Sequence, residues 1–162
     1  NMSYVQAAYL GTYYYLVNTD KPPVDDVLVR RALSYALDRD TLTRTVLQET
    51  AIPAYSITPP DTLGYNPPKL FDYDPAKARE LLAEAGYPNG QGWPGLEIIY
   101  NTQEAHRKIA VAVQQMWKKE LNIDVTISNQ EWKVYLNSVS QRDFQVARRG
   151  WIGDYVLSLI HI

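Results

Sequence analysis

The pattern of hydrophobic residues changes along the chain, and these changes indicate where strands and helices are expected. Stretches rich in Tyr, Val, Leu and Ile have the composition of β-strands, whereas apolar residues spaced three or four positions apart indicate helices. We expect strands at 4–18, 96–100, 123–127 and 144–152, and helices at 27–37, 38–47, 74–86, 104–121 and 132–140. Strands that alternate with helices in this way are typical of an α/β or an α+β domain.

Two of the expected helices begin with acidic residues that fit a capping role. Asp74 precedes Pro75 at the start of one helix, and Gly86 follows its last turn, which is the usual order of a capped helix. Asp25 and Asp26 likewise precede another helix. Paired carboxylates can act as acid and base in catalysis, but at these positions we interpret them as helix caps.

The stretch between residues 52 and 75 has a different character. Six prolines fall within it, separated by tyrosines and a phenylalanine. Proline removes a backbone donor and fixes φ, so this stretch cannot form a regular helix or a central strand. The aromatic side chains favour a long loop packed on the body of the domain, with a domain boundary as the alternative.

Composition narrows the classes of function. The chain has 162 residues, a net charge of −2 and no cysteine, and its only histidines are His106 and His161. The near-neutral charge gives no field that would recruit nucleic acid. The absence of thiols and the scarcity of histidines argue against disulfides and against a metal site, so no cofactor is expected. No apolar run approaches the ~20 residues of a membrane span.

The sequence shows no pattern typical of a catalytic site. The glycines between 86 and 95 match neither a dinucleotide fingerprint nor a phosphate-binding P-loop, and no serine lies in a nucleophile elbow. His106, near the start of the helix at 104–121, is most simply a surface histidine. We therefore expect a protein that is not an enzyme, with a carboxylate-based hydrolase as the remote alternative.

Binding chemistry is concentrated in the segment 146–155. It brings two arginines, an indole, two glycines and a carboxylate within ten residues. Gly150 permits the close approach of a ligand, Trp151 offers a flat apolar wall, and Asp154 is suited to an ammonium group. A β-turn with a salt-bridged surface is the alternative interpretation. A second polar cluster, which ends in Trp132, lies at an expected strand-to-helix junction.

Seven motifs, in this order along the chain, resemble those of the extracellular solute-binding proteins of family 5, the oligopeptide-binding components of ABC importers. They lie at 11–15, 29–39, 53–60, 81–87, 100–110, 130–132 and 150–155. The resemblance implies a mixed sheet flanked by helices, an α/β lobe of the two-lobed periplasmic-binding-protein type. We therefore assign residues 1–155 to part of the C-terminal lobe. Residues 156–162 do not match the family's continuation and form an atypical tail, which a truncation or a foreign scar would explain.

The same resemblance implies a function. Members of the family hold a short peptide between two lobes that close over it, and deliver it to a membrane permease. We therefore expect short peptides, an ABC permease and the N-terminal lobe of the same protein as partners. The expected location is extracytoplasmic, either periplasmic or lipid-anchored. A dipeptide, a nickel chelate, haem or an oligosaccharide are the alternative ligands, and an obligate oligomer with paired half-clefts is a further possibility.

Site residues are carried over from the motifs that match. Asp154 corresponds to the carboxylate that pairs with the α-ammonium group of the peptide. Gly150, Trp151 and Ile152 correspond to the strand that offers backbone hydrogen bonds, and Trp151 and Trp132 correspond to walls of side-chain pockets. Further positions correspond to residues that face the far end of the peptide, namely Arg148, Asn101 and His106, or that lie beside the cleft, namely Tyr9 and Tyr14.

The chain departs from the family pattern at two places. Some members carry an arginine seven residues after the position of Trp132, where it helps to receive the peptide carboxylate. This chain has Val139 there, so the preferred peptide length stays open. Some members also join the positions of Gly11 and Ile152 by a disulfide, and here both cysteines are absent together.

Overall fold

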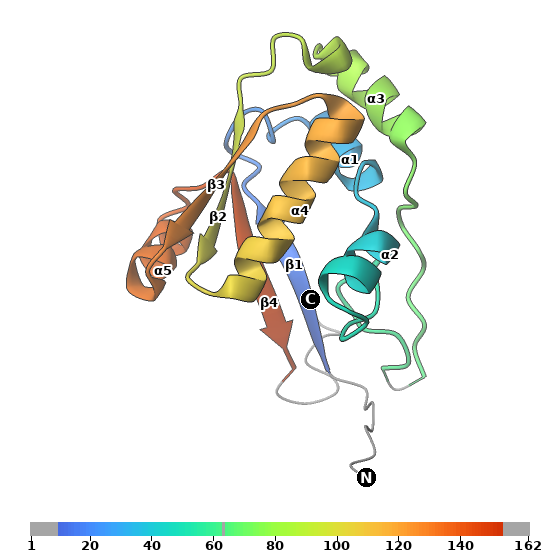
Figure 1. Ribbon diagram of the computed structural model, residues 1–162, viewed down its shortest axis with the longest axis vertical. Coiled ribbons are helices and arrows are strands. Elements are labelled where there is room, and N and C mark those ends of the chain that lie inside the picture. Colours follow the sequence, from blue (N-terminus) through green and yellow to red (C-terminus); the bar gives the residue numbers. More distant parts are fainter. Residues whose placement is uncertain (1–9, 63, 154–162) are drawn as a thin grey trace.

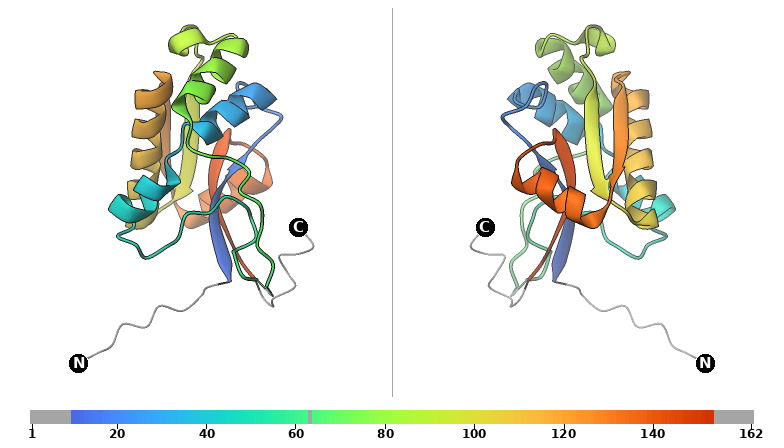
Figure 2. Two further views of the ribbon diagram at one scale, coloured as in Figure 1. Left: turned by 90° about the vertical axis from the view of Figure 1, so that its right-hand side faces the viewer. Right: turned by 90° about the vertical axis from the view of Figure 1, so that its left-hand side faces the viewer.

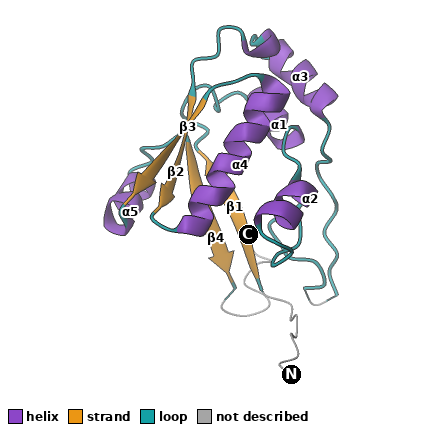
Figure 3. Ribbon diagram, in the orientation of Figure 1, coloured by secondary structure: helices purple, strands orange, loops and turns teal. Residues whose placement is uncertain are grey.

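The computed structural model describes residues 10–62 and 64–153. The strands within these ranges form one four-stranded sheet in the order β1-β4-β2-β3 (Figure 1, Figure 3). They are β1 Gly11–Val17, β2 Leu96–Asn101, β3 Val125–Gln130 and β4 Val146–Ile152. β1 runs antiparallel to β4, whereas β2 is parallel to both β4 and β3. The expected mixed sheet of an α/β protein is confirmed.

Helices connect these strands and confirm the expected helical stretches. They are α1 Val27–Tyr35, α2 Arg39–Thr41, α3 Pro75–Glu84, α4 Glu104–Leu121 and α5 Trp132–Ser140. A π-helical segment, Leu42–Val46, continues α2, and a 3₁₀ turn, Pro88–Gly90, precedes β2. Within the described ranges, no helix combines the length and the apolar character needed to cross a membrane.

The acidic helix starts are caps, as the sequence predicts. The Asp26 carboxylate accepts a hydrogen bond from the backbone N–H of Leu28 at 2.7 Å. The Asp74 carboxylate accepts one from the backbone N–H of Lys77 at 2.9 Å. Each bond satisfies a donor that the first helical turn leaves without an intrahelical partner. These aspartates therefore define where α1 and α3 begin.

The two faces of the sheet are covered unequally. Helices α1, α3 and α4 pack on one face and α5 packs on the other (Figure 2). The larger core includes the buried side chains of Val29, Leu33, Leu82, Ile98, Val113, Trp117 and Val146. The smaller core consists of Ile99, Tyr135, Phe144 and Ala147. Successive residues of β2 and β4 contribute to opposite cores because side chains alternate along a strand.

The proline-rich stretch is a loop held against the body of the domain. The hydroxyl of Thr12 on β1 donates to the carbonyl of Ile57 at 2.7 Å. The hydroxyl of Tyr55 donates to the Asp40 carboxylate at 2.6 Å. The ring of Phe71 also packs edge-on against the ring of Tyr35, with ring centroids 5.4 Å apart. The prediction of a packed loop is confirmed.

The connections between the parallel strands cross opposite faces of the sheet. α4 leads from β2 to β3 over one face, whereas α5 leads from β3 back to β4 over the other face. The chain therefore leaves the carboxyl ends of the neighbouring strands β2 and β3 toward opposite faces of the sheet. In α/β sheets, such a point of reversal is where ligands usually bind.

Candidate ligand-binding site

Several predicted site residues lie together at the carboxyl ends of β2 and β4. Arg148 points from β4 toward Asn101, the last residue of β2, and its Nη1 donates to the Asn101 Oδ1 at 3.4 Å. Gly150, Trp151 and Ile152 follow on the same strand. The structure therefore places these five residues together at one end of the sheet, on the neighbouring strands β2 and β4.

Arg148 carries a positive charge with no neutralising partner in the described structure. Its guanidinium lies 4.9 Å from the centre of the Tyr13 ring. Within residues 10–62 and 64–153, no carboxylate lies within 4 Å of it. Its Nε atom is buried and has no hydrogen-bond partner in that part of the chain. A partly buried cation with free donors is an anion-binding group.

His106 is buried, so the expectation of a surface histidine is wrong. Its side chain is only 5% exposed and lies against Tyr13, with ring centroids 5.6 Å apart. Burial, and secondly the charge of Arg148, lower the pKa of His106 to about 4. The imidazole is therefore neutral near pH 7, and its Nδ1 has no partner within the described residues. A neutral imidazole can offer a ligand either a donor or an acceptor.

Two tyrosines of β1 complete the surroundings of Arg148, and sequence reasoning did not assign them. Tyr15 pairs with Arg148 in the β1–β4 register and Tyr13 pairs with Gly150, so both lie on the face of the sheet that carries Arg148. Burial raises the pKa of Tyr13 to about 12, against the effect of Arg148, and also raises the pKa of Tyr15. Both hydroxyls are protonated at neutral pH. Both tyrosines lie in the motif at 11–15, but the register that turns them toward Arg148 could not be read from sequence.

The predicted residue Tyr14 lies on the opposite face of the sheet. It pairs with Arg149, one position away from Arg148, and alternation along the strand turns both away from His106. Trp151 is on this second face as well. The candidate site therefore extends over both faces at the end of β4, with a cationic side and an aromatic side.

Trp132 belongs to the aromatic side. It begins α5 and stacks on Tyr135, with ring centroids 5.9 Å apart and planes 20° from parallel. The buried Tyr135 donates its hydroxyl to the carbonyl of Arg148, which ties α5 to β4. Trp132 remains 49% exposed and Trp151 37% exposed. Two half-exposed indoles near one strand end are suited to contact apolar side chains of a ligand.

β4 continues as a strand through Ile152, so the alternative of a β-turn is wrong for residues 146–152. All seven of its residues pair with β1, but β2 pairs only with Val146 and Ala147. From Arg148 onward, the edge of β4 that faces β2 has no strand partner in the described sheet. A Cβ atom at Gly150 would meet only ordinary contacts, the nearest at 3.5 Å. Packing within the chain therefore does not require glycine there.

Two predicted residues cannot be placed. Tyr9 and Asp154 lie outside the described residues, as does the tail at 156–162. Within the described ranges, no group of three His, Cys, Asp or Glu side chains is arranged to hold a metal ion. The residues that the structure does bring together offer a cation, neutral donors, indoles and free backbone. These groups have the chemistry to bind a ligand.

Comparison with known proteins places this architecture in a family. The family model for bacterial extracellular solute-binding proteins, family 5 Middle, matches residues 1–158. The periplasmic oligopeptide-binding protein OppA of Salmonella typhimurium is 44% identical over 153 residues, covering 91% of this chain and 28% of that protein. The periplasmic murein peptide-binding protein MppA of Escherichia coli is 46% identical over 153 residues, with coverage of 90% and 28%.

Solved structures agree with the sequence relatives. A periplasmic oligopeptide-binding protein from Borrelia burgdorferi superimposes with a TM-score of 0.87 at 42% identity, covering 95% of this chain and 31% of that one. Haemophilus influenzae OppA in complex with RPPGFSPFR gives a TM-score of 0.82 at 38% identity, with coverage of 93% and 31%. The chain thus spans less than a third of the length of these relatives. It belongs to the bacterial extracellular solute-binding proteins of family 5.

Proposed function

We propose that the protein containing this chain is the substrate-binding component of an ABC importer that captures short peptides and delivers them to a permease. The relatives from Salmonella and Escherichia are named for binding oligopeptides and murein peptides, and the Haemophilus structure holds a peptide. Residues 1–155 form part of the C-terminal lobe, and a second lobe closes over the ligand. The protein acts outside the cytoplasm, in the periplasm or on a lipid anchor, and binds without catalysis.

The observation that carries this proposal is the unpaired edge of β4 beside an uncompensated arginine. An extended peptide can add to that edge through main-chain hydrogen bonds from residue 148 onward, which gives affinity without reading the peptide sequence. Trp151 and Trp132 then contact side chains of the peptide. Arg148 and His106 face a carboxylate, because a guanidinium binds carboxylates in a two-pronged geometry.

Asp154 has the complementary role in this proposal. Following the family resemblance, its carboxylate receives the α-ammonium group of the peptide. Calorimetry on the full-length protein with a free tripeptide tests this assignment. Asp154→Ala weakens binding tenfold or more, and acetylation of the peptide's amino terminus causes a comparable loss. Asp143→Ala is the matched control, because Asp143 is an exposed aspartate near the start of β4 that forms a surface ion pair with Lys21 at 3.5 Å.

The outcomes of this experiment separate the alternatives. Unchanged affinity for Asp154→Ala, with a loss for the acetylated peptide, would place the ammonium partner elsewhere. Indifference to acetylation, or a lack of any peptide binding, would contradict the peptide assignment and favour another ligand of the family. Arg148→Gln with an amidated peptide tests the carboxylate end in the same way: the substitution matters for the free acid and has little effect for the amide.

A further inference from the structure

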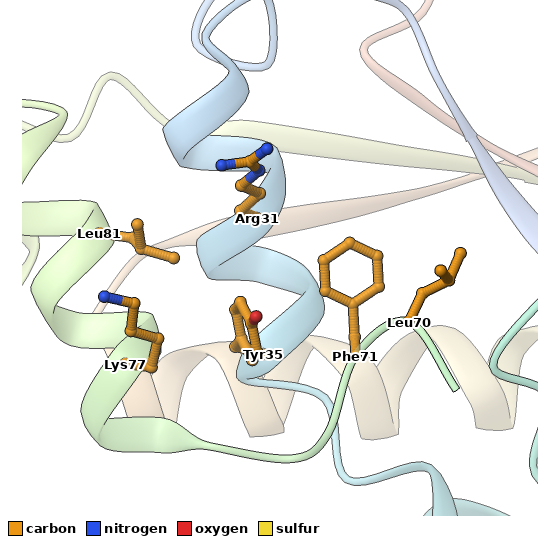
Figure 4. Close-up of a pocket in the computed structure, with 6 residues that line it drawn as sticks. All are labelled: Arg31, Tyr35, Leu70, Phe71, Lys77 and Leu81. Atoms are coloured by element: carbon orange, nitrogen blue, oxygen red, sulfur yellow. The ribbon is translucent and has the colours of Figure 1, made fainter. Parts of the chain in front are cut away.

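A hollow lies between α1 and α3, away from the candidate peptide site. Its volume is about 410 Å³, and Figure 4 shows its lining: Arg31, Tyr35, Leu70, Phe71, Lys77 and Leu81. In Figure 1, α3 lies near the end of the molecule opposite to the one where β2 and β4 terminate. A ligand in this hollow would therefore not compete with one bound at the ends of those strands.

The walls of the hollow are fixed by interactions that do not depend on a ligand. The backbone N–H of Asp74 donates to the carbonyl of Tyr35 at 2.9 Å, which joins the start of α3 to the end of α1. The rings of Tyr35 and Phe71 pack edge-to-face, and Leu81 of α3 on the other side of the hollow is buried at 6% exposure. A preformed apolar floor lowers the ordering cost of binding.

Positive charge borders this apolar floor. Arg31 and Lys77 project from different helices, and among the residues that the structure describes they are the charged ones that line the hollow. Lys77 forms a surface ion pair with Glu80 at 2.9 Å. For Arg31, no carboxylate lies within 4 Å in the described part of the chain. Glu80 matches the charge of Lys77, so Arg31 supplies the positive charge that the described residues leave unmatched, and this charge favours an acidic group of a partner.

The shape of the hollow indicates what kind of occupant fits. It is open on one side, and Leu70 at its edge is 59% exposed. A free small molecule would keep much of its surface in water there, whereas small-molecule sites usually bury most of theirs. A side chain that projects from another protein brings its own covering surface. Exposed ion pairs are individually weak, which suits a reversible contact.

We propose that the hollow between α1 and α3 is a docking site for a segment of a partner protein that presents an aromatic or aliphatic side chain next to a carboxylate. The apolar side chain lies on Tyr35, Phe71 and Leu81. The carboxylate lies between Arg31 and Lys77. The proposal depends on these residues alone and does not require the peptide-binding function.

Amide NMR spectra of the isotope-labelled chain test this docking site. The probes are acetyl-Glu-Phe-Glu-amide, acetyl-Glu-Gly-Glu-amide and acetyl-Lys-Phe-Lys-amide, whose blocked termini remove the charges that the other site is proposed to recognise. The first peptide shifts the amides of Tyr35, Phe71 and Leu81 with an affinity in the millimolar range, and the other two bind at least fivefold more weakly. Added salt weakens the binding because screening acts on exposed charges.

Variants assign the effect to the two cations. The double substitution R31Q and K77Q reduces affinity for acetyl-Glu-Phe-Glu-amide at least fivefold. K108Q is the matched control for the lysine, because Lys108 pairs with Glu104 at 3.0 Å on an exposed helix face, much as Lys77 pairs with Glu80. This control binds the peptide as the unaltered chain does. All the substituted side chains are at the surface, so the spectra remain those of a folded protein.

Several results would overturn the proposal. One is an absence of shifts around Tyr35 with any probe, and another is equal binding of all three peptides. Equal binding of phenylacetate would identify a small-molecule site instead, and shifts that follow protein concentration without peptide would identify a self-association surface. Shifts confined to Trp151 and His106 would also overturn it, while leaving the peptide-binding proposal standing.

Discussion

Asn18 links the end of β1 to the chain segment that leads into β4. Its buried side-chain amide donates to the carbonyls of Arg142 at 2.9 Å and Phe144 at 3.0 Å, and its Oδ1 accepts from the N–H of Asp20. Asn18→Ala removes these three bonds, two of them to carbonyls with few other partners. We expect the free energy of unfolding to fall by about 2–3 kcal/mol, measured by urea denaturation.

A matched asparagine distinguishes this effect from a general effect of removing an amide. Asn137 is exposed on α5, and Asn137→Ala should change the free energy of unfolding by no more than about 0.5 kcal/mol. If the two substitutions prove equally mild, the hydrogen bonds of Asn18 contribute little to the stability of the sheet.

His106 makes stability depend on pH. Its pKa is about 4 in the folded chain against an ordinary value of 6.5, so between these values the unfolded chain binds more protons. Stability should therefore fall as the pH drops from 7 toward 4. Water at the open end of the sheet screens part of this effect, and we expect roughly 1 kcal/mol between pH 7 and pH 5.

Comparing the unaltered chain with a His106 variant separates the effect of this histidine on stability from that of carboxylates that titrate in the same pH range. Urea denaturation at pH 7 and pH 5 is measured for the unaltered chain and for His106→Gln, which keeps a neutral polar side chain. The variant should lose less stability on acidification. Parallel losses in the two chains would show that His106 is protonated equally easily in the folded and unfolded states.

The surroundings of individual site residues could not be predicted from the sequence. Arg148, Gly150 and Trp151 were predicted because they form a local motif. The burial of His106 follows instead from its contact with Tyr13, and that contact joins α4 to β1. Tyr13 and Tyr15 face Arg148 only because β1 pairs with β4 in one particular register. Such information depends on pairing between residues far apart in the chain.

At the scale of elements, α3 offers a direct test of capping. Asp74→Ala removes the side-chain acceptor for the Lys77 N–H but leaves the backbone bond from Asp74 to Tyr35. We expect a loss of about 1 kcal/mol in the free energy of unfolding. Asp72→Ala is the control, since Asp72 forms a surface ion pair with Lys69 and caps no helix in the described structure, and it should cost less than about 0.5 kcal/mol. Equal losses would contradict the cap.

Local patterns were sufficient for most elements and insufficient for their arrangement. The capped helix α3 and the long helix α4 follow from helical spacing, caps and termini. The π-helical turn at Leu42–Val46 was expected only as helix, because its wider hydrogen bonding leaves no distinct sequence pattern. The sheet order β1-β4-β2-β3 was also not predicted, since it depends on pairing between strands more than a hundred residues apart.

At the scale of the whole molecule, the two surfaces with ligand chemistry lie at different ends. The ends of β2 and β4 present Arg148, two indoles and a free strand edge, whereas the hollow near α3 presents a smaller apolar floor between two cations. The rigid core of α1, α3 and α4 on the sheet lies between them. The two proposed sites could therefore be occupied at the same time. A protein that holds one ligand while it docks on another protein needs such an arrangement.

Under the function proposed above, the peptide site of the isolated chain should bind much more weakly than that of the full-length protein. A peptide on β4 contacts only one lobe here, and its charges stay in contact with water. The attraction of two unit charges 4 Å apart is about 1 kcal/mol in water but about 4 kcal/mol at an effective dielectric constant of 20. Closure of a second lobe therefore strengthens the ion pair with Arg148, besides adding contacts.

We expect the same tripeptide to bind the isolated chain at least ~100-fold more weakly, a difference of about 2.7 kcal/mol. Calorimetry on both proteins measures this ratio. Similar affinities would mean that the described lobe alone holds the complete site, and that closure serves only recognition by the partner.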